Sequence, residues 1–169
     1  AAWACFALGC ATRGDNAEEG DSPIYGGTRD AESAAVLALR IQWPGKTELC
    51  SGTLIAPNVV LTARHCVSQQ IVAQVSCDDR GRSLNGTQLG GDVDPSAIRI
   101  FTGIGAEIAK VETARGKAIF HPEGFVLCNA DIALVVLDAP LETIEPLAVR
   151  REGKISRVVY RLVGFFHLN

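Results

Sequence analysis

The fold of this chain is decided by the stretch Leu61-Thr62-Ala63-Arg64-His65-Cys66, which is reached through Cys50-Ser51-Gly52-Thr53-Leu54-Ile55. Two apolar runs thus precede a histidine, and a cysteine directly follows that histidine in the sequence. Further along, an aspartate opens another apolar run, Asp131-Ile132-Ala133-Leu134. A histidine oriented by a carboxylate supplies two of the three groups of a nucleophilic triad. The third group, a serine in an activated setting, is not visible in the sequence.

Composition indicates a globular chain with one sizeable core. The 169 residues are 47% hydrophobic, carry a formal net charge of −3 and contain no internal repeat that we can detect. Because no basic run or basic patch with interleaved aromatic residues is present, nucleic acid is not expected as a partner. The sequence contains no methionine, so we expect it to be a fragment or a processed product.

The six cysteines, at positions 5, 10, 50, 66, 77 and 128, form no C-x-x-C pair. A metal site built from His65, Cys66 and His121 is disfavoured by this spacing, and neither a metal nor a cofactor is predicted. Disulfides formed in an oxidising compartment explain the cysteines better, so we expect an exported protein.

The first 23 residues are predicted to lie outside the folded domain. Residues 1–10 are apolar over about the length of a signal-peptide core, far short of a membrane span. Ala7-Leu8-Gly9-Cys10 is similar to a bacterial lipoprotein box, in which case Cys10 would carry a lipid anchor. This anchor would be the only expected link between the protein and a membrane. An ordinary cleaved signal and an exposed apolar tail remain open. Residues 11–22 are polar and acidic and predict a linker, so the domains are 1–23 and 24–169.

From Ile24 onward the pattern predicts an all-β fold. Short apolar or alternating segments recur every 8 to 15 residues, separated by turns rich in glycine. Such spacing favours a closed antiparallel β-barrel over a βαβ fold. We expect strands at 34–43, 49–55, 58–63, 71–76, 98–101, 107–120 with an interruption at Gly116, and 132–137. The last of these is expected to be buried on both faces. Residues 78–94 are expected to be loop, with the acids at 78–79 and 92–94 simply solvated.

These motifs together resemble the chymotrypsin/trypsin family of serine endopeptidases. Ile24-Tyr25-Gly26-Gly27 corresponds to the mature start, and the segments ending at Ile55, Cys66 and Leu134 correspond to motifs around the histidine and aspartate. The resemblance covers about residues 24–164. It implies the first barrel of a two-barrel fold plus the first strand of the second barrel, at Val158–Val163, with the second barrel truncated.

The resemblance implies roles for individual residues. His65 would be the general base, and Asp131 would fix its tautomer and stabilise the imidazolium. His121 would have a structural role only. Cys50 and Cys66 would form the disulfide beneath the histidine loop. Cys77 and Cys128 are then the two cysteines left over after residue 23, and we infer that they form a second pair.

The sequence departs from the family in several places, and two of them concern the candidate site. No serine lies in the Gly-Asp-Ser-Gly-Gly setting of the family's nucleophile, so this chain alone is predicted to be inactive, whether through truncation, a frameshift or true loss of function. Arg64 replaces a small residue, and we expect its side chain to point to solvent.

The predicted function is peptide-bond hydrolysis by a serine endopeptidase, with a protein or peptide substrate if the protein is full length. A non-catalytic pseudoprotease or binding module is the alternative, and a cysteine peptidase would need a nucleophile that the sequence also lacks. The expected location is outside the cytoplasm, either secreted or lipid-anchored at a bacterial envelope.

Overall fold

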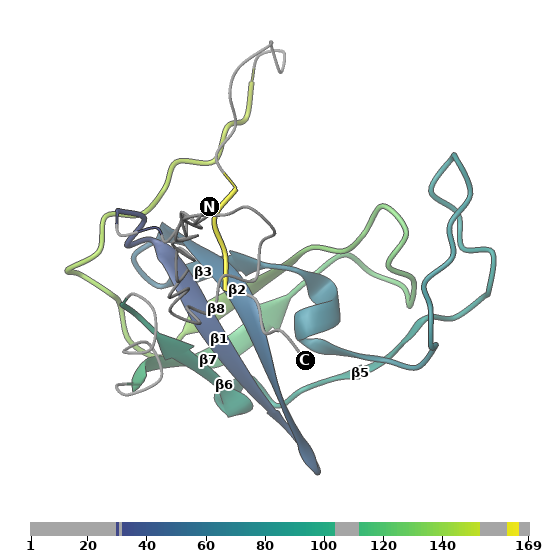
Figure 1. Cartoon of the computed structure of the whole chain (residues 1–169), viewed down its shortest axis with the longest axis horizontal. Coiled ribbons are helices and arrows are strands. Elements are labelled where there is room, and N and C mark those ends of the chain that lie inside the picture. Colours follow the sequence, from purple (N-terminus) through teal and green to yellow (C-terminus); the bar gives the residue numbers. More distant parts are fainter. Residues whose placement is uncertain (1–29, 31, 104–111, 153–161, 166–169) are drawn as a thin grey trace, which may run out of the picture.

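The structure, a computed structural model, describes residues 30, 32–103, 112–152 and 162–165 (Figure 1). Six strands close an antiparallel barrel in the order β1-β2-β3-β8-β7-β6, and β4 and β5 form a separate small sheet. The predicted closed antiparallel barrel is therefore confirmed. The elements are β1 (Val36–Trp43), β2 (Lys46–Ala56), β3 (Val59–Thr62), the 3-10 helix η1 (Arg64–Cys66), β4 (Ser68–Gln70), β5 (Leu89–Asp92), the 3-10 helix η2 (Pro95–Ala97), β6 (Ile98–Phe101), β7 (Glu112–Phe120) and β8 (Ala133–Leu137).

The barrel core follows from the two-residue period of its strands. Successive side chains of a strand point to opposite faces, so alternate residues of each strand fill the interior. Fully or almost fully buried side chains from five strands meet there: Leu37, Leu39, Ile41, Leu54, Val60, Ile98, Ile100, Ala133, Val135 and Leu137. Their branched and apolar character makes burial of this surface the main stabilising contribution to the fold.

Two glycines allow backbone segments to approach closely inside this barrel. A Cβ atom on Gly52 would lie 2.5 Å from Val60 Cγ1 and 2.7 Å from Leu39 Cδ1. On β7, a Cβ atom on Gly116 would lie 2.4 Å from the carbonyl oxygen of Pro95. The expected interruption of the strand at Gly116 is wrong, because β7 continues through it. The glycine accommodates η2, and the pairing register shifts just beyond it.

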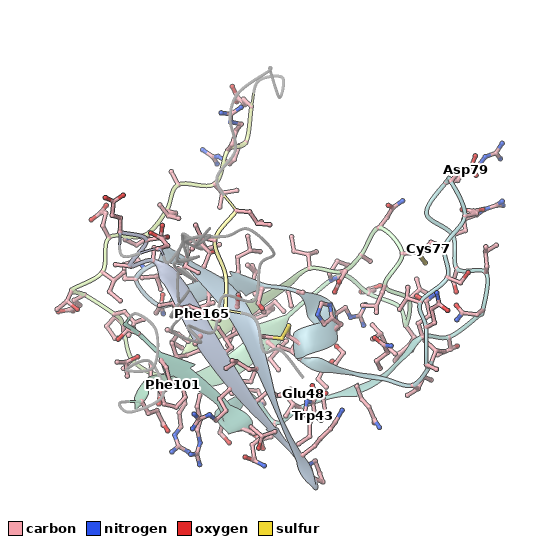
Figure 2. The ribbon with its side chains drawn as sticks, viewed as in Figure 1. Trp43, Glu48, Cys77, Asp79, Phe101 and Phe165 are labelled. Atoms are coloured by element: carbon pink, nitrogen blue, oxygen red, sulfur yellow. A yellow bond between two sulfur atoms is a disulfide. The ribbon has the colours of Figure 1, made fainter. Side chains whose placement is uncertain are left out.

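The hairpin between β1 and β2 is regular along its length. Its pairs run from Val36↔Thr53 to Trp43↔Lys46, and Gly45 closes the turn with a φ of 79°. That left-handed conformation is open to glycine at little cost. At this end of the hairpin Trp43 Nε1 donates a hydrogen bond to Glu48 Oε2 at 2.9 Å (Figure 2). The strand predicted at 34–43 is confirmed, and the one predicted at 49–55 extends further in both directions.

The segment between β4 and β5 differs from the prediction. Residues 71–76 form no strand, and Ile71 is 53% exposed, so its alternation does not mark a buried face. The segment 78–94, expected to be loop, instead contains β5, which pairs with β4. Glycine is depleted in strands, and the pair Gly90-Gly91 therefore hid this strand from a pattern-based prediction.

The last barrel strand is buried on one face. Ala133, Val135 and Leu137 point into the core, whereas Leu134 and Val136 are only half-buried. The expectation of burial on both faces is therefore wrong: the barrel interior covers one side of the strand, and the alternation is concealed because both faces carry apolar residues.

A short C-terminal segment lies on the outside of the barrel. Phe165 packs against Ala38 and Phe101, and its carbonyl oxygen accepts a hydrogen bond from Ser51 Oγ at 2.9 Å. In Figure 2, Phe165 lies over the β1–β2 hairpin. The expected strand at Val158–Val163 falls mostly outside the described residues, and the two described positions, 162 and 163, have no strand assignment. The motif at Ile24-Tyr25-Gly26-Gly27 and Cys10 also lie outside them.

Candidate active site

Two loops at one end of the barrel bring His65 and Asp131 together. His65 lies on η1, directly after β3, and Asp131 lies just before β8. Because β3 and β8 are paired antiparallel, with Thr62 opposite Ala133, the end of one strand meets the start of the other. The predicted pairing of these two residues, 66 positions apart, is thus present as a contact.

The contact involves both carboxylate oxygens. Asp131 Oδ2 lies 2.8 Å from His65 Nδ1, and Asp131 Oδ1 accepts a hydrogen bond from the His65 backbone amide at 2.9 Å. An ionised carboxylate can only accept hydrogen bonds, so this geometry assigns the proton to Nδ1. In the neutral imidazole, Nε2 then carries the lone pair. The His65 side chain is 49% exposed, so this nitrogen is open to a proton donor.

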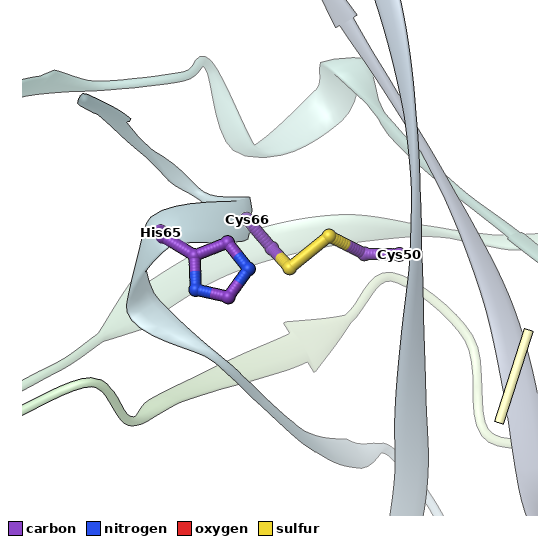
Figure 3. Close-up of side chains that lie close together, drawn as sticks. All are labelled: Cys50, His65 and Cys66. Carbon is purple, nitrogen blue, oxygen red and sulfur yellow. A yellow bond between two sulfur atoms is a disulfide. The ribbon is translucent and has the colours of Figure 1, made fainter. Parts of the chain in front are cut away.

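A disulfide lies beside the imidazole. Cys50 on β2 is bonded to Cys66 on η1, and the ring of His65 lies close to the two sulfur atoms (Figure 3). Cys50, His65 and Cys66 form a compact set of groups of the kind that bind metals. Because both sulfurs are consumed in the disulfide, neither can act as a thiolate ligand. The crosslink instead fixes the short helix that carries His65 to the barrel wall.

Arg64 behaves differently from the prediction. Its side chain is buried, with only 2% of its surface exposed, and does not point to solvent. Nη1 donates to the carbonyl oxygen of Pro122 at 3.0 Å, and Nη2 donates to that of Gly124 at 2.6 Å. These two carbonyls replace water around the Nη groups, which offsets part of the cost of burial, while the buried Nε has no hydrogen-bond partner among the described residues.

His121 lies in a second polar cluster behind η1. Its Nε2 is 2.8 Å from Asp92 Oδ2 and its Nδ1 is 2.9 Å from the Pro122 carbonyl oxygen, and it makes no hydrogen bond to His65 or Asp131. Ser68 Oγ donates to Asp92 Oδ1 at 2.6 Å. The acids at 92–94 were expected to be solvated, and the Asp92 side chain is 37% exposed. Its carboxylate also accepts a hydrogen bond from Ser68, because β5 pairs with β4 and brings the two residues together.

The pKa of Asp92 lies below the ordinary value of 3.8. Partial burial by itself raises this pKa. Hydrogen bonds from Ser68 and His121, together with the positive charges of His121 and Arg64, favour the carboxylate more strongly and lower it overall. The pKa values of Asp94 and Asp78 are also lowered. Asp94 accepts hydrogen bonds from Ser96. Asp78 accepts hydrogen bonds from Arg82, which have the larger effect, and from Arg80.

The loop that leads to Asp131 is held at several points. Cys128 is bonded to Cys77, the second disulfide expected from parity. Gln88 is fully buried, and its Oε1 accepts the Leu127 amide at 2.8 Å. Sequence reasoning missed Gln88, because a glutamine between two loop segments looks like a solvated residue. In Figure 2, Cys77 lies far from the barrel, on the excursion between β4 and β5.

A groove runs past His65 on the side of the hairpin. It has a volume of about 840 Å³, and its lining includes Arg40, Glu48, Cys50, His65 and Gln69. Across the described parts of the chain, no serine hydroxyl is hydrogen-bonded to His65. None of the helices in those parts combines the length and apolarity needed to cross a bilayer.

Comparisons with known proteins bear on the family of the chain. The sequence profile of the trypsin family, described as Trypsin, matches residues 24–160. Among solved structures, one described as "Structure of Glu endopeptidase in complex with MPD" is 22% identical with a TM-score of 0.47, and the match covers 75% of this chain and 50% of that one. The chain thus spans about half the length of that structure. A search of curated proteins found no match.

The disulfides and the family profile lead to two conclusions. Two disulfides in a chain of this type are typical of exported proteins. Because the family profile matches most of its length, the chain belongs to the trypsin family.

Proposed function

We propose that this chain supplies the general base and its orienting carboxylate to a serine endopeptidase that hydrolyses peptide bonds. The observation that carries the proposal is the contact of His65 Nδ1 with Asp131 Oδ2 at 2.8 Å, in a member of the trypsin family. His65 would take the proton from an attacking serine hydroxyl through Nε2 and later return it to the leaving amine. Asp131 would hold the ring in the required tautomer. The substrate class is a protein or peptide.

The 169-residue polypeptide by itself is proposed to be inactive. Its sequence contains no serine in the setting that the family uses, and no serine of the described residues is hydrogen-bonded to His65. In a serine protease of another fold, loss of the serine alone reduces turnover by about 10⁶. We propose that a polypeptide continuing beyond Asn169 into a second barrel would supply the nucleophile and the oxyanion hole.

The remaining parts of the proposal concern processing and location. The peptidase domain would begin at Ile24 and run to Asn169, incomplete, after a leader and acidic linker in residues 1–23. Export follows from the leader and from the disulfides, and Cys10 would carry a lipid anchor at a bacterial envelope. Mass spectrometry of the mature N-terminus tests this part: an unmodified chain that retains residues 1–9 would contradict it.

The catalytic proposal is tested with a polypeptide extended past Asn169, incubated with a mixed peptide library and with a fluorophosphonate probe that labels activated serines. Cleavage and labelling are expected for the extended protein and not for the 169 residues alone. His65→Gln in the extended protein should lower turnover by about 10⁶, while Gln74→Glu, at an exposed residue outside the groove, should retain turnover. Cleavage that survives His65→Gln would refute the proposal.

A binding module without catalysis is the second candidate. It is supported by the groove beside His65, which a partner peptide could occupy without being cleaved. Failure of the extended protein both to cleave peptides and to react with the probe, together with saturable binding of uncleaved peptides, would favour this candidate.

A further inference from the structure

We infer that Arg64 is a positioning residue, which holds the turn at 122–124 against the helix carrying His65 and thereby fixes where Asp131 stands relative to the imidazole. The functional meaning of this inference rests on the proposed role of the His65–Asp131 pair. The geometric claim itself does not, because it concerns only how two loops are joined.

The first observation is the buried guanidinium. Arg64 is 2% exposed and is among the largest fully buried side chains of the described residues. An ion in this position is strongly unfavourable unless its donors are paired. The two Nη groups of Arg64 bind two carbonyl oxygens of one turn, those of Pro122 and Gly124, at 3.0 and 2.6 Å, and only the buried Nε has no partner among the described residues. A planar guanidinium with donors in a fixed fork restricts both the distance and the orientation of that turn.

The second observation is the place of this contact in the sequence. Arg64 immediately precedes His65, and Gly124 lies seven residues before Asp131. The same short helix is therefore joined to the same loop twice. One attachment is Arg64 to the turn, and the other is the His65 backbone amide to Asp131 Oδ1 at 2.9 Å. Between the two attachments, the disulfide at Cys128 and the hydrogen bond of the Leu127 amide to Gln88 restrict the loop further.

The third observation is that the turn has a second attachment, through His121 at its start. The Pro122 carbonyl oxygen that accepts from Arg64 also lies 2.9 Å from His121 Nδ1, and His121 Nε2 lies 2.8 Å from Asp92 Oδ2. The positive charge of Arg64 also acts on Asp92 across the cluster and has the smallest of the effects described above on the pKa of that carboxyl. Arg64 thus couples η1 to β5 through the turn, and loosening this link would remove one of the restraints on the loop that ends in Asp131.

Variants at position 64 separate positioning from simple stability. Arg64→Met keeps much of the apolar stem and removes the donors, while Arg64→Lys keeps the charge but cannot reproduce the fork toward two carbonyls. Arg99→Met is the matched control, because Arg99 is a half-exposed arginine on β6 whose partner, Glu112, lies 3.6 Å away. The full 169-residue chain is used throughout.

The readout is hydrogen exchange of the His65 backbone amide, corrected for any change in global unfolding, together with the NMR signal of the His65 Nδ1 proton. Exchange at His65 should become at least tenfold faster in Arg64→Met, with broadening or loss of the Nδ1 signal. Arg64→Lys should give a smaller change in the same direction, and Arg99→Met none. Unchanged exchange and an unchanged Nδ1 signal in a folded Arg64→Met protein would overturn the inference.

Two further measurements test the inference, and the first needs no variant and applies even if the Arg64 variants do not fold. In the wild-type chain, the Nη protons of Arg64 should appear as separate, slowly exchanging signals, and a single averaged signal would overturn the inference. In the extended protein, Arg64→Lys should lower kcat and leave KM unchanged, and an unchanged kcat would also overturn it. If the extended wild-type protein cleaves nothing, the proposed function fails, while the exchange data on His65 still decide whether Arg64 positions the loop.

Discussion

Asp131 holds His65 through two separate hydrogen bonds, one to the backbone amide at 2.9 Å and one to the imidazole Nδ1 at 2.8 Å. The two bonds restrict different freedoms. The bond to the amide fixes the distance between the two loops, and the bond to Nδ1 fixes the ring orientation and the tautomer. A single carboxylate thereby determines where Nε2 points.

Replacing this carboxylate should disturb the tautomer more than the fold. Asp131→Asn can still accept from the His65 amide, but its side-chain NH₂ group can face Nδ1 and favour the tautomer protonated at Nε2. In the extended protein, kcat should fall by about 10⁴, a figure that comes from another member of this family and is carried over. Nitrogen NMR of the imidazole reports the tautomer. Asp79→Asn, at an exposed loop residue, is the control, and an unchanged tautomer in Asp131→Asn would contradict the prediction.

The second disulfide should contribute strongly to stability. Cys77 and Cys128 are 51 residues apart, against 16 for Cys50 and Cys66. Since a crosslink restricts the unfolded chain more when it closes a longer loop, the double variant Cys77→Ala/Cys128→Ala should lose about 4 kcal/mol of unfolding free energy. Urea unfolding of the variant and of the wild type, each with and without reductant, measures this loss. A loss below about 1 kcal/mol would show that the crosslink contributes little.

Gly52 should tolerate no side chain. A methyl group there would meet Val60 and Leu39, both fully buried, at 2.5 and 2.7 Å. Relieving such overlap in a packed core costs about 1–3 kcal/mol, so Gly52→Ala should lower the urea midpoint accordingly. Gly91→Ala is the matched control on β5, since no other group lies within 4 Å of where its methyl group would stand and its φ lies outside the left-handed region. Equal stability of the two variants would refute this account of Gly52.

The contribution of Asp92 to folding stability should decrease as the pH is lowered. The pKa of Asp92 is below 3.8 in the folded protein, so the folded state favours the carboxylate relative to the unfolded chain. This contribution is fully present above the unfolded value of about 3.9 and is lost as the pH falls through the lower folded pKa. Wild type should therefore exceed Asp92→Asn in stability at about pH 5, with the difference shrinking toward about pH 2. Urea unfolding across this range measures the trend, and a difference independent of pH would contradict it.

Much of the barrel was predictable from local pattern. The strands at Val36–Trp43, Val59–Thr62 and Ile98–Phe101 follow from short apolar or alternating runs between turn residues. β5 was missed because Gly90 and Gly91 carry no side chain to reveal a face. The alternation of β8 was hidden because its outward residues, Leu134 and Val136, are apolar as well.

The site divides along the same line. The sequence by itself determined which residues carry the chemistry, since the motifs around His65 and Asp131 depend on residue type and order. Only the tertiary structure decided the surroundings of those residues. Arg64 was expected to be solvated because an arginine beside an exposed histidine ordinarily is, and Asp92 because it lies among loop acids. Arg64 is buried and pairs with a carbonyl group at Gly124, whereas Asp92 stays exposed and accepts a hydrogen bond from the hydroxyl of Ser68; both partners lie tens of residues away in the sequence. Local sequence does not encode such partners, because a buried charge is stabilised only by groups that the closed fold brings to it.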